Sequence, residues 1–141
     1  MEESVLPRLY REAPLNSIWE GSGNVIALDL LRAIRRNPEV VEAFITELDR
    51  GAGLHPGVDT AIGSASAALR NADGDEASAR RLAEQLAMTW AATLLVQHGD
   101  PDVSDLYVQS RLNRDWGTEF GTLPPSATLR QIADRAVPAV S

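Results

Sequence analysis

The stretch that decides the fold is residues 76–98, which read EASARRLAEQLAMTWAATLLVQH. An apolar residue recurs every four positions along it, which is typical of the buried face of an amphipathic helix. This predicted core stripe consists of Leu82, Leu86, Trp90 and Leu94. At a rise of about 1.5 Å per residue the helix would be about 35 Å long, the longest in the chain. Asp75 is placed to cap its start and Gly99 to end it.

Three further helices are predicted on the N-terminal side of this stretch. Residues 25–36 are apolar at almost every position, so we expect that helix to be covered on most sides. Asn37-Pro38 then restarts the chain, with asparagine as the cap and proline in the first turn of a helix over residues 38–49. After a glycine-rich loop, apolar residues recur at spacings of four, three and four, which favours the buried face of a bundle helix. These residues are Val58, Ile62, Ala65 and Leu69.

The C-terminal part of the chain adds two shorter helices, over residues 104–114 and 127–136, separated by a glycine- and proline-rich stretch at 116–125. No segment shows the alternation that is typical of a strand. Helices of these lengths joined by short loops indicate an all-α fold, an antiparallel helical bundle. We therefore predict an irregular segment over residues 1–24 and a helical bundle over residues 25–141, together one domain.

Composition limits the class of protein. With 141 residues, of which 44% are hydrophobic and 23% charged, the chain is long enough for one domain with a real core. The absence of cysteine excludes disulfide frameworks, thiol catalysis and zinc fingers. No apolar run is long enough to span a bilayer, and residues 1–20 lack the basic-then-apolar pattern of a signal peptide. We therefore predict a soluble, cytoplasmic protein.

The charge of the chain is acidic and unevenly placed. All 13 basic residues are arginine, against 20 acidic residues, and the whole excess of −7 lies in residues 37–141. Such a surface repels a phosphate backbone, so nucleic-acid binding is disfavoured. Arg80-Arg81 is interpreted as part of a solvated helix face in preference to a phosphate clamp. His55 and His98 have no carboxylate at ligand spacing, so no metal site is predicted.

One segment differs from the helices around it. Residues 15–24 read LNSIWEGSGN and lead directly into an apolar helix. Within it, Glu20 lies between a tryptophan and two glycines, which allow a ligand to approach backbone N–H groups closely. A carboxylate against apolar walls has a raised pKa and can act as a general base. The alternative is a simple helix start, with Ser22 or Asn24 as the cap and Glu20 near the positive end of the helix dipole.

The N-terminal residues resemble the C-terminal helical domain of acyl-CoA dehydrogenases. The resemblance rests on two runs, Tyr10-Arg11-Glu12-Ala13 and Ile18-Trp19-Glu20-Gly21-Ser22-Gly23-Asn24. In most of that superfamily the second run reads aromatic-Glu-Gly-Thr/Ser, followed by a polar residue. Trp19 in place of the usual tyrosine, and Asn24 one position later than the usual polar residue, are similar to the AidB-like and isovaleryl-CoA-dehydrogenase-like branch. The resemblance is specific over residues 3–32, and beyond them helix number and length are compatible.

The resemblance implies roles for individual residues. Glu20 stands where these enzymes place the base that takes the α-proton of an acyl-CoA thioester, while FAD accepts the β-hydrogen as hydride. The positions that contact FAD correspond to Trp19, Gly21, Ser22, Gly23 and Asn24. Arg32 stands where the family often has an arginine near the active site, and the other interpretation is an ion pair with Asp29. The implied activity is the α,β-dehydrogenation of an acyl-CoA in fatty acid metabolism.

Further expectations follow from domains of the family's enzymes that have no counterpart in these 141 residues. In complete enzymes, an N-terminal helical domain and a middle β-domain supply the acyl pocket and most of the FAD site. We therefore expect the chain to be the C-terminal part of a larger enzyme, inactive by itself. Family members assemble through this helical domain, which implies a homo-oligomer. Two alternatives stay open: an AidB-like DNA-binding domain, which the charge of −7 disfavours, and a stand-alone helical oligomerisation module.

Overall fold

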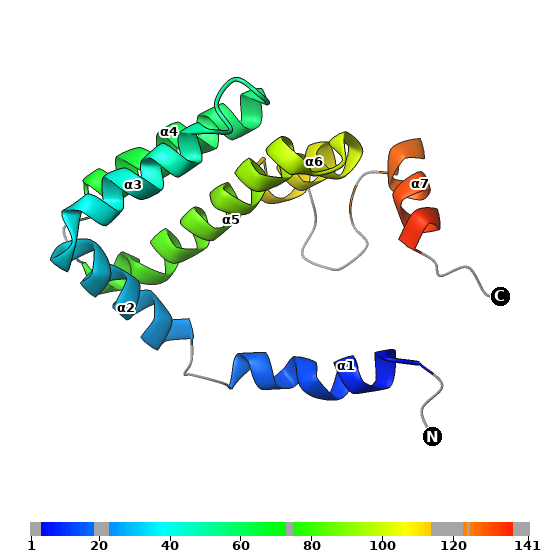
Figure 1. The fold of residues 1–141 in the computed structure, drawn as a ribbon, viewed down its shortest axis with the longest axis horizontal. Helices are drawn as coiled ribbons and strands as arrows, with labels where there is room; N and C mark the ends of the chain where they lie inside the picture. The colour runs from blue at the N-terminus through cyan, green and yellow to red at the C-terminus, as the bar shows by residue number, and fades with distance from the viewer. Residues whose placement is uncertain (1–3, 19–22, 73–74, 114–122, 124, 137–141) are drawn as a thin grey trace.

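The computed structural model describes residues 4–18, 23–72, 75–113, 123 and 125–136. All regular elements in these ranges are helical, which confirms the predicted all-α bundle (Figure 1). The bundle consists of α2 (Gly23–Arg36), α3 (Pro38–Asp49), α4 (Pro56–Arg70), α5 (Ala79–His98) and α6 (Pro101–Tyr107). In Figure 1, α3, α4 and α5 lie side by side in alternating directions, and α2 packs against α5.

The core lies between α3, α4 and α5 and includes one face of α2. The buried face predicted for α4 is confirmed, because all four of its residues are buried: Val58, Ile62, Ala65 and Leu69. Helix α3 has the predicted bounds and buries Val41, Ile45 and Leu48. The spacing of apolar residues on these two helices therefore predicted their packing correctly.

The connection between α2 and α3 differs in one detail from the prediction. Pro38 occupies the first turn of α3, as expected, but the Asn37 side chain makes no cap bond to that helix. Its Nδ2 instead donates to the carbonyl of Ala33, in the last turn of α2, over 3.2 Å. The Ala33 carbonyl also accepts from the backbone N–H of Asn37 over 3.0 Å, so Asn37 closes the end of α2 through both its backbone and its side chain.

The core stripe predicted for α5 is correct for its first half and wrong for its second. Leu82 and Leu86 are buried, but Trp90 is 44% exposed and Leu94 is 37% exposed. A step of four residues overshoots one helical turn by about 40°, so a uniform spacing of four drifts off the buried face. The residues buried in the second half are Thr89, Ala92 and Thr93. Burial of Thr93 is tolerated because its Oγ1 donates to the carbonyl of Thr89 over 2.9 Å.

The ends of α5 lie close to the predicted ones. Its first turn is a 3₁₀ helix, η2 (Glu76–Ser78), so the α-helix starts three residues later than expected. Asp75 is confirmed as the cap, because its side chain accepts a hydrogen bond from the backbone of Ala77 over 3.1 Å. The helix ends before Gly99, as predicted, although Gly99 has extended backbone rather than a left-handed conformation.

Helix α2 is less covered than the sequence predicted. Only Ala27 and Leu31 are buried among its residues, whereas Val25 is 47% exposed and Ile26 is 58% exposed. Within this chain the expected coverage on most sides is therefore not found. Helix α2 lies at the edge of the bundle, where α3 and α5 cover one face of it.

The C-terminal elements follow a modified version of the prediction. Helix α6 starts at Pro101 rather than near Ser104, because Asp100 caps it by accepting from the backbone N–H groups of Asp102 (2.9 Å) and Val103 (3.3 Å). It continues into a π-helical turn, η3 (Val108–Leu112). Helix α7 (Ala127–Ala136) has the predicted bounds and has no buried residue. Most of the predicted loop at 116–125 lies outside the described residues.

The N-terminal segment was expected to be irregular, and that expectation is wrong for residues 6–17. They form α1 (Leu6–Glu12) followed by a 3₁₀ turn, η1 (Ala13–Ser17). Pro7 and Pro14 each lie in the first turn of their element, where the missing N–H costs little. In Figure 1, α1 extends away from the bundle, and it buries no residue.

Substitution of glycine by alanine should have opposite effects on stability at two positions of α4, Gly57 and Gly63. A Cβ at Gly57 would lie 2.5 Å from Cγ1 of Val108, a buried β-branched residue of η3, so Gly57→Ala should destabilise the fold by about 1–3 kcal/mol. At Gly63 the Cβ would meet no described atom within 4 Å, so Gly63→Ala should stabilise the helix by up to about 1 kcal/mol. Urea denaturation of both variants measures the difference. Equal midpoints would contradict the close approach of α4 and η3.

Candidate functional site

The sequence places the candidate site at the start of α2, and the structure describes two of its residues there. Gly23 is the first residue of α2 and Asn24 the second. Among described atoms, a Cβ at Gly23 would meet the Nη2 of Arg80 alone, at 3.8 Å, which is an ordinary van der Waals distance. The other predicted residues of the motif lie outside the described ranges: Trp19, Glu20, Gly21 and Ser22.

Arg80, in the first turn of α5, is a functional candidate that the sequence interpretation placed on a solvated face. Its Nη1 donates to Oδ1 of Asn24 over 3.2 Å, across 56 positions of sequence. The side chain is exposed, as expected for a solvated face. It also contacts the last residue of the predicted cofactor segment, residues 19–24. No pattern within either segment signals this contact, because it depends on the packing of α2 against α5.

Arg32 forms the ion pair that was one of its two interpretations. Its Nη1 lies 2.6 Å from Oδ1 of Asp29, three residues earlier on α2. Both side chains are about 60% exposed, so the pair is a surface contact rather than a buried one. An exposed pair of this kind contributes little stability, and it leaves the predicted role of Arg32 near an active site as a prediction.

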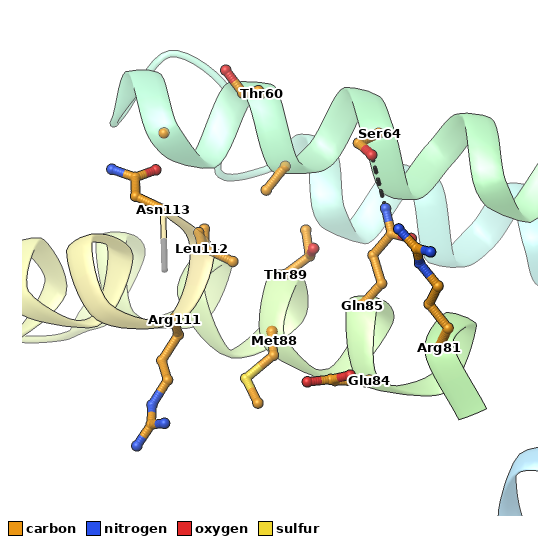
Figure 2. Close-up of a pocket in the computed structure, with 12 residues that line it drawn as sticks. Thr60, Ser64, Arg81, Glu84, Gln85, Met88, Thr89, Arg111, Leu112 and Asn113 are labelled. Carbon is orange, nitrogen blue, oxygen red and sulfur yellow. Dashed lines mark hydrogen bonds between the residues drawn. The ribbon is translucent and has the colours of Figure 1, made fainter. Parts of the chain in front are cut away.

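A polar groove of about 370 Å³ runs between α4 and α5 and is shown in Figure 2. Ser64 and Gln85 face each other across it, with Nε2 of Gln85 donating to Oγ of Ser64 over 2.9 Å. Leu112 and Asn113, at the end of η3, lie at one end of the groove. Arg81 and Glu84 add opposite charges to its lining. The groove can therefore bind polar groups, but it contains none of the predicted site residues.

A second hollow, of about 320 Å³, is almost entirely apolar and lies between α2, α3 and α5. Its walls include Ile26 of α2, Val40 of α3 and Trp90 of α5, which are all exposed to a large extent. Trp90 also meets Phe44 edge to face, with ring centroids 5.8 Å apart. The exposed part of α2 therefore continues into an apolar groove on the surface of this chain.

His55 and the surface groups with shifted pKa values have structural partners. Nδ1 of His55 accepts from the backbone of Gly57 over 2.9 Å and caps α4. The hydrogen bond from Arg135 lowers the pKa of Asp100, and the bond from Arg70 lowers the pKa of Glu42. The first pair joins α7 to the cap residue of α6, and the second joins α4 to α3, both at the surface.

Tyr107 lies next to the polar groove, and its pKa is shifted. Its hydroxyl donates to Sδ of Met88, which lines that groove, over 3.3 Å. Burial raises the pKa of Tyr107. The described ranges contain no cluster of three histidine or acidic residues that could hold a metal ion. Along those same ranges, no helix combines the length and apolarity needed to cross a bilayer.

Two curated proteins resemble this chain in sequence. The Escherichia coli (strain K12) protein named "Putative acyl-CoA dehydrogenase AidB" is 33% identical over 119 residues, which are 84% of this chain. The Caenorhabditis elegans acyl-CoA dehydrogenase family member 11 is 43% identical over 44 residues, or 31% of the chain. This chain belongs to the acyl-CoA dehydrogenase superfamily and is AidB-like.

The matched region is a minor part of each acyl-CoA dehydrogenase relative. It spans 22% of AidB, about a fifth of its length, and 7% of family member 11. No protein-family model and no solved structure matches the chain. Sequence similarity to AidB therefore supports the family and its AidB-like branch, while the helical bundle comes from the structure of the chain itself.

Proposed function

We propose that this chain supplies the general base and part of the FAD site of a flavin-dependent acyl-CoA dehydrogenase, as the C-terminal part of a larger enzyme. The observation that carries the proposal is the similarity to AidB over 84% of the chain, which agrees with the Trp-Glu-Gly-Ser-Gly-Asn motif of residues 19–24. Because the chain spans about a fifth of AidB, we propose that the chain by itself has an incomplete flavin site and no activity.

The proposed chemistry assigns one role to each residue of the segment. The carboxylate of Glu20 takes the α-proton of an acyl-CoA thioester, and the neighbouring Trp19 contacts the cofactor. When FAD is bound, it accepts the β-hydrogen as hydride. Gly21, Ser22, Gly23 and Asn24 contact the cofactor. Arg32 lies 12 positions after Glu20 in the sequence and supplies positive charge near the active site.

The described end of the motif fits an anionic cofactor. The first turn of α2 has backbone N–H groups without intrahelical partners, and these favour an anion. The guanidinium of Arg80 lies beside Gly23, the first residue of α2. The donors gathered there therefore suit the diphosphate of FAD.

We also propose that the chain assembles as a homo-oligomer. The support is the exposed apolar surface on α2 and the apolar groove beside it, because surfaces of this kind mark interaction sites in proteins. The second candidate function, DNA binding, has no support of this kind. The formal net charge is −7, and the polar groove lined by Arg81 also contains Glu84.

Titration of the isotope-labelled chain with FAD, followed by NMR, tests the proposed cofactor site. We expect weak binding, with amide signal changes concentrated on residues 19–24 and on the indole N–H of Trp19. Because the site is incomplete, desalting should remove the flavin. An equal concentration of inorganic pyrophosphate should shift the signals of Gly23 and Asn24 alone, since it lacks the flavin ring.

Two outcomes would count against this assignment. Signal changes confined to the polar groove, for example at Ser64 and Gln85, would move the ligand site away from the motif. A chain that stays yellow after desalting would show that these 141 residues hold FAD firmly, which contradicts the incomplete site. An assay with saturated acyl-CoA esters and an artificial electron acceptor should detect no turnover by the chain alone.

A further inference from the structure

We propose that Arg80 is a positioning residue for the cofactor segment: through its hydrogen bond to Asn24 it holds the start of α2 against the bundle. The inference rests on the proposed function in one respect, that residues 19–24 bind FAD. The contact between Arg80 and Asn24 does not depend on that function. Neither the sequence motif nor the similarity to AidB points to a residue so far along the chain.

The geometry of the contact is specific to the first residues of α2. Nη1 of Arg80 lies 3.2 Å from Oδ1 of Asn24, and Nη2 lies 3.8 Å from the place of a Cβ on Gly23. The nearest buried residue of α2 is Ala27, three positions further on. The burial of α2 in the core therefore begins after Asn24. Arg80 provides a separate attachment for Asn24 and the start of the helix.

The chemistry of arginine suits this position. A guanidinium has five N–H donors in a rigid plane, so it can hold the amide oxygen of Asn24 and still offer donors to a second group. Its positive charge beside the first turn of α2 is unfavourable to the helix dipole alone. An anionic group bound there would remove that conflict. The diphosphate of FAD, bound as in the proposed function, is such a group.

Arg81 provides a matched control within the same turn of α5. Its side chain lines the polar groove between α4 and α5 (Figure 2), whereas the side chain of Arg80 contacts Asn24 of α2. Replacing either arginine by methionine removes one positive charge from the same helix turn and keeps an unbranched side chain. A difference between the two variants therefore reports the contact with Asn24 rather than the net charge or the helix propensity.

The experiment compares Arg80→Met, Arg80→Lys and Arg81→Met in the full chain. We expect Arg80→Met to shift the side-chain amide signals of Asn24 and the backbone amide of Gly23, and to weaken FAD binding by about threefold to tenfold, as for loss of an exposed charge-assisted hydrogen bond. Arg80→Lys should restore most of both effects, because lysine can donate to the same oxygen. Arg81→Met should leave the Asn24 signals unchanged and alter FAD binding by less than about twofold.

The two readouts separate failure of this inference from failure of the proposed function. If FAD fails to bind the wild-type chain, the proposed function fails, and the Asn24 signals still decide the role of Arg80. Unchanged Asn24 signals in Arg80→Met would overturn the inference whether or not FAD binds. Equal losses of FAD binding in Arg80→Met and Arg81→Met would also overturn it, because they would indicate net charge alone.

Discussion

Substitution of Glu20 by glutamine should lower the rate of acyl-CoA dehydrogenation by about 10²–10⁴-fold in an enzyme that carries this segment. Glutamine has nearly the same size and shape as glutamate but cannot accept the α-proton at neutral pH. The binding of FAD, to which the neighbouring residues contribute in our proposal, should change little. The loss should therefore appear in kcat, with the flavin content of the enzyme unchanged.

The measurement uses a chimera in which this whole chain replaces the corresponding part of AidB. Glu12→Gln is the matched control, because Glu12 lies on α1 and pairs at the surface with Arg8 over 2.9 Å. That variant should keep the rate of the unsubstituted chimera within about twofold. If Glu20→Gln and Glu12→Gln have equal rates in a chimera that retains FAD, Glu20 is not the base.

Leu48→Ala should destabilise the fold by about 2–5 kcal/mol, the usual cost of removing a buried leucine side chain. Leu48 is fully buried, with 0% exposure, in the last turn of α3, and it belongs to the core that α3, α4 and α5 share. The cost includes the lost burial of the side chain and the cavity left behind, since the surrounding helices relax only in part. Urea denaturation followed by circular dichroism gives the free energy of unfolding.

Leu54→Ala is the control for this substitution. Leu54 lies in the loop between α3 and α4 and is 55% exposed, so the same change of side chain should cost about 0.5 kcal/mol or less. Similar unfolding midpoints for the two variants would show that α3 does not pack on α4 and α5 as described. A large loss for Leu48→Ala alone would support the core as the structure places it.

The spacing of apolar residues predicted some helices better than others, for a geometric reason. On α4 the intervals of four, three and four average about 3.7 residues per turn, close to the period of an α-helix, so the residues stay on one face. On α5 the uniform interval of four exceeds the helical period, so successive residues move off the buried face. Trp90 and Leu94 therefore lie at the surface. The two threonines buried in their place, Thr89 and Thr93, have no apolar signal in the sequence.

The sequence predicted the chemistry of the candidate site only where that chemistry depends on residues close together in the chain. The resemblance to acyl-CoA dehydrogenases depends on the motif that ends at Asn24, and the similarity to AidB supports the family. The sequence also allowed two interpretations of Arg32. The structure shows the ion pair with Asp29, which is a local contact within one helix. Its catalytic role stays a prediction, because it depends on a substrate and a flavin.

By itself the sequence determined the helical class, the bounds of α3 and α7, the buried face of α4 and the AidB-like family, because these depend on residues close together in the chain. Only the tertiary structure decided that α2 lies at the edge of the bundle and that Arg80 contacts Asn24. Both depend on how α2 and α5 pack. That packing follows from the shapes and burial of many side chains at once, and no local pattern in either helix encodes it.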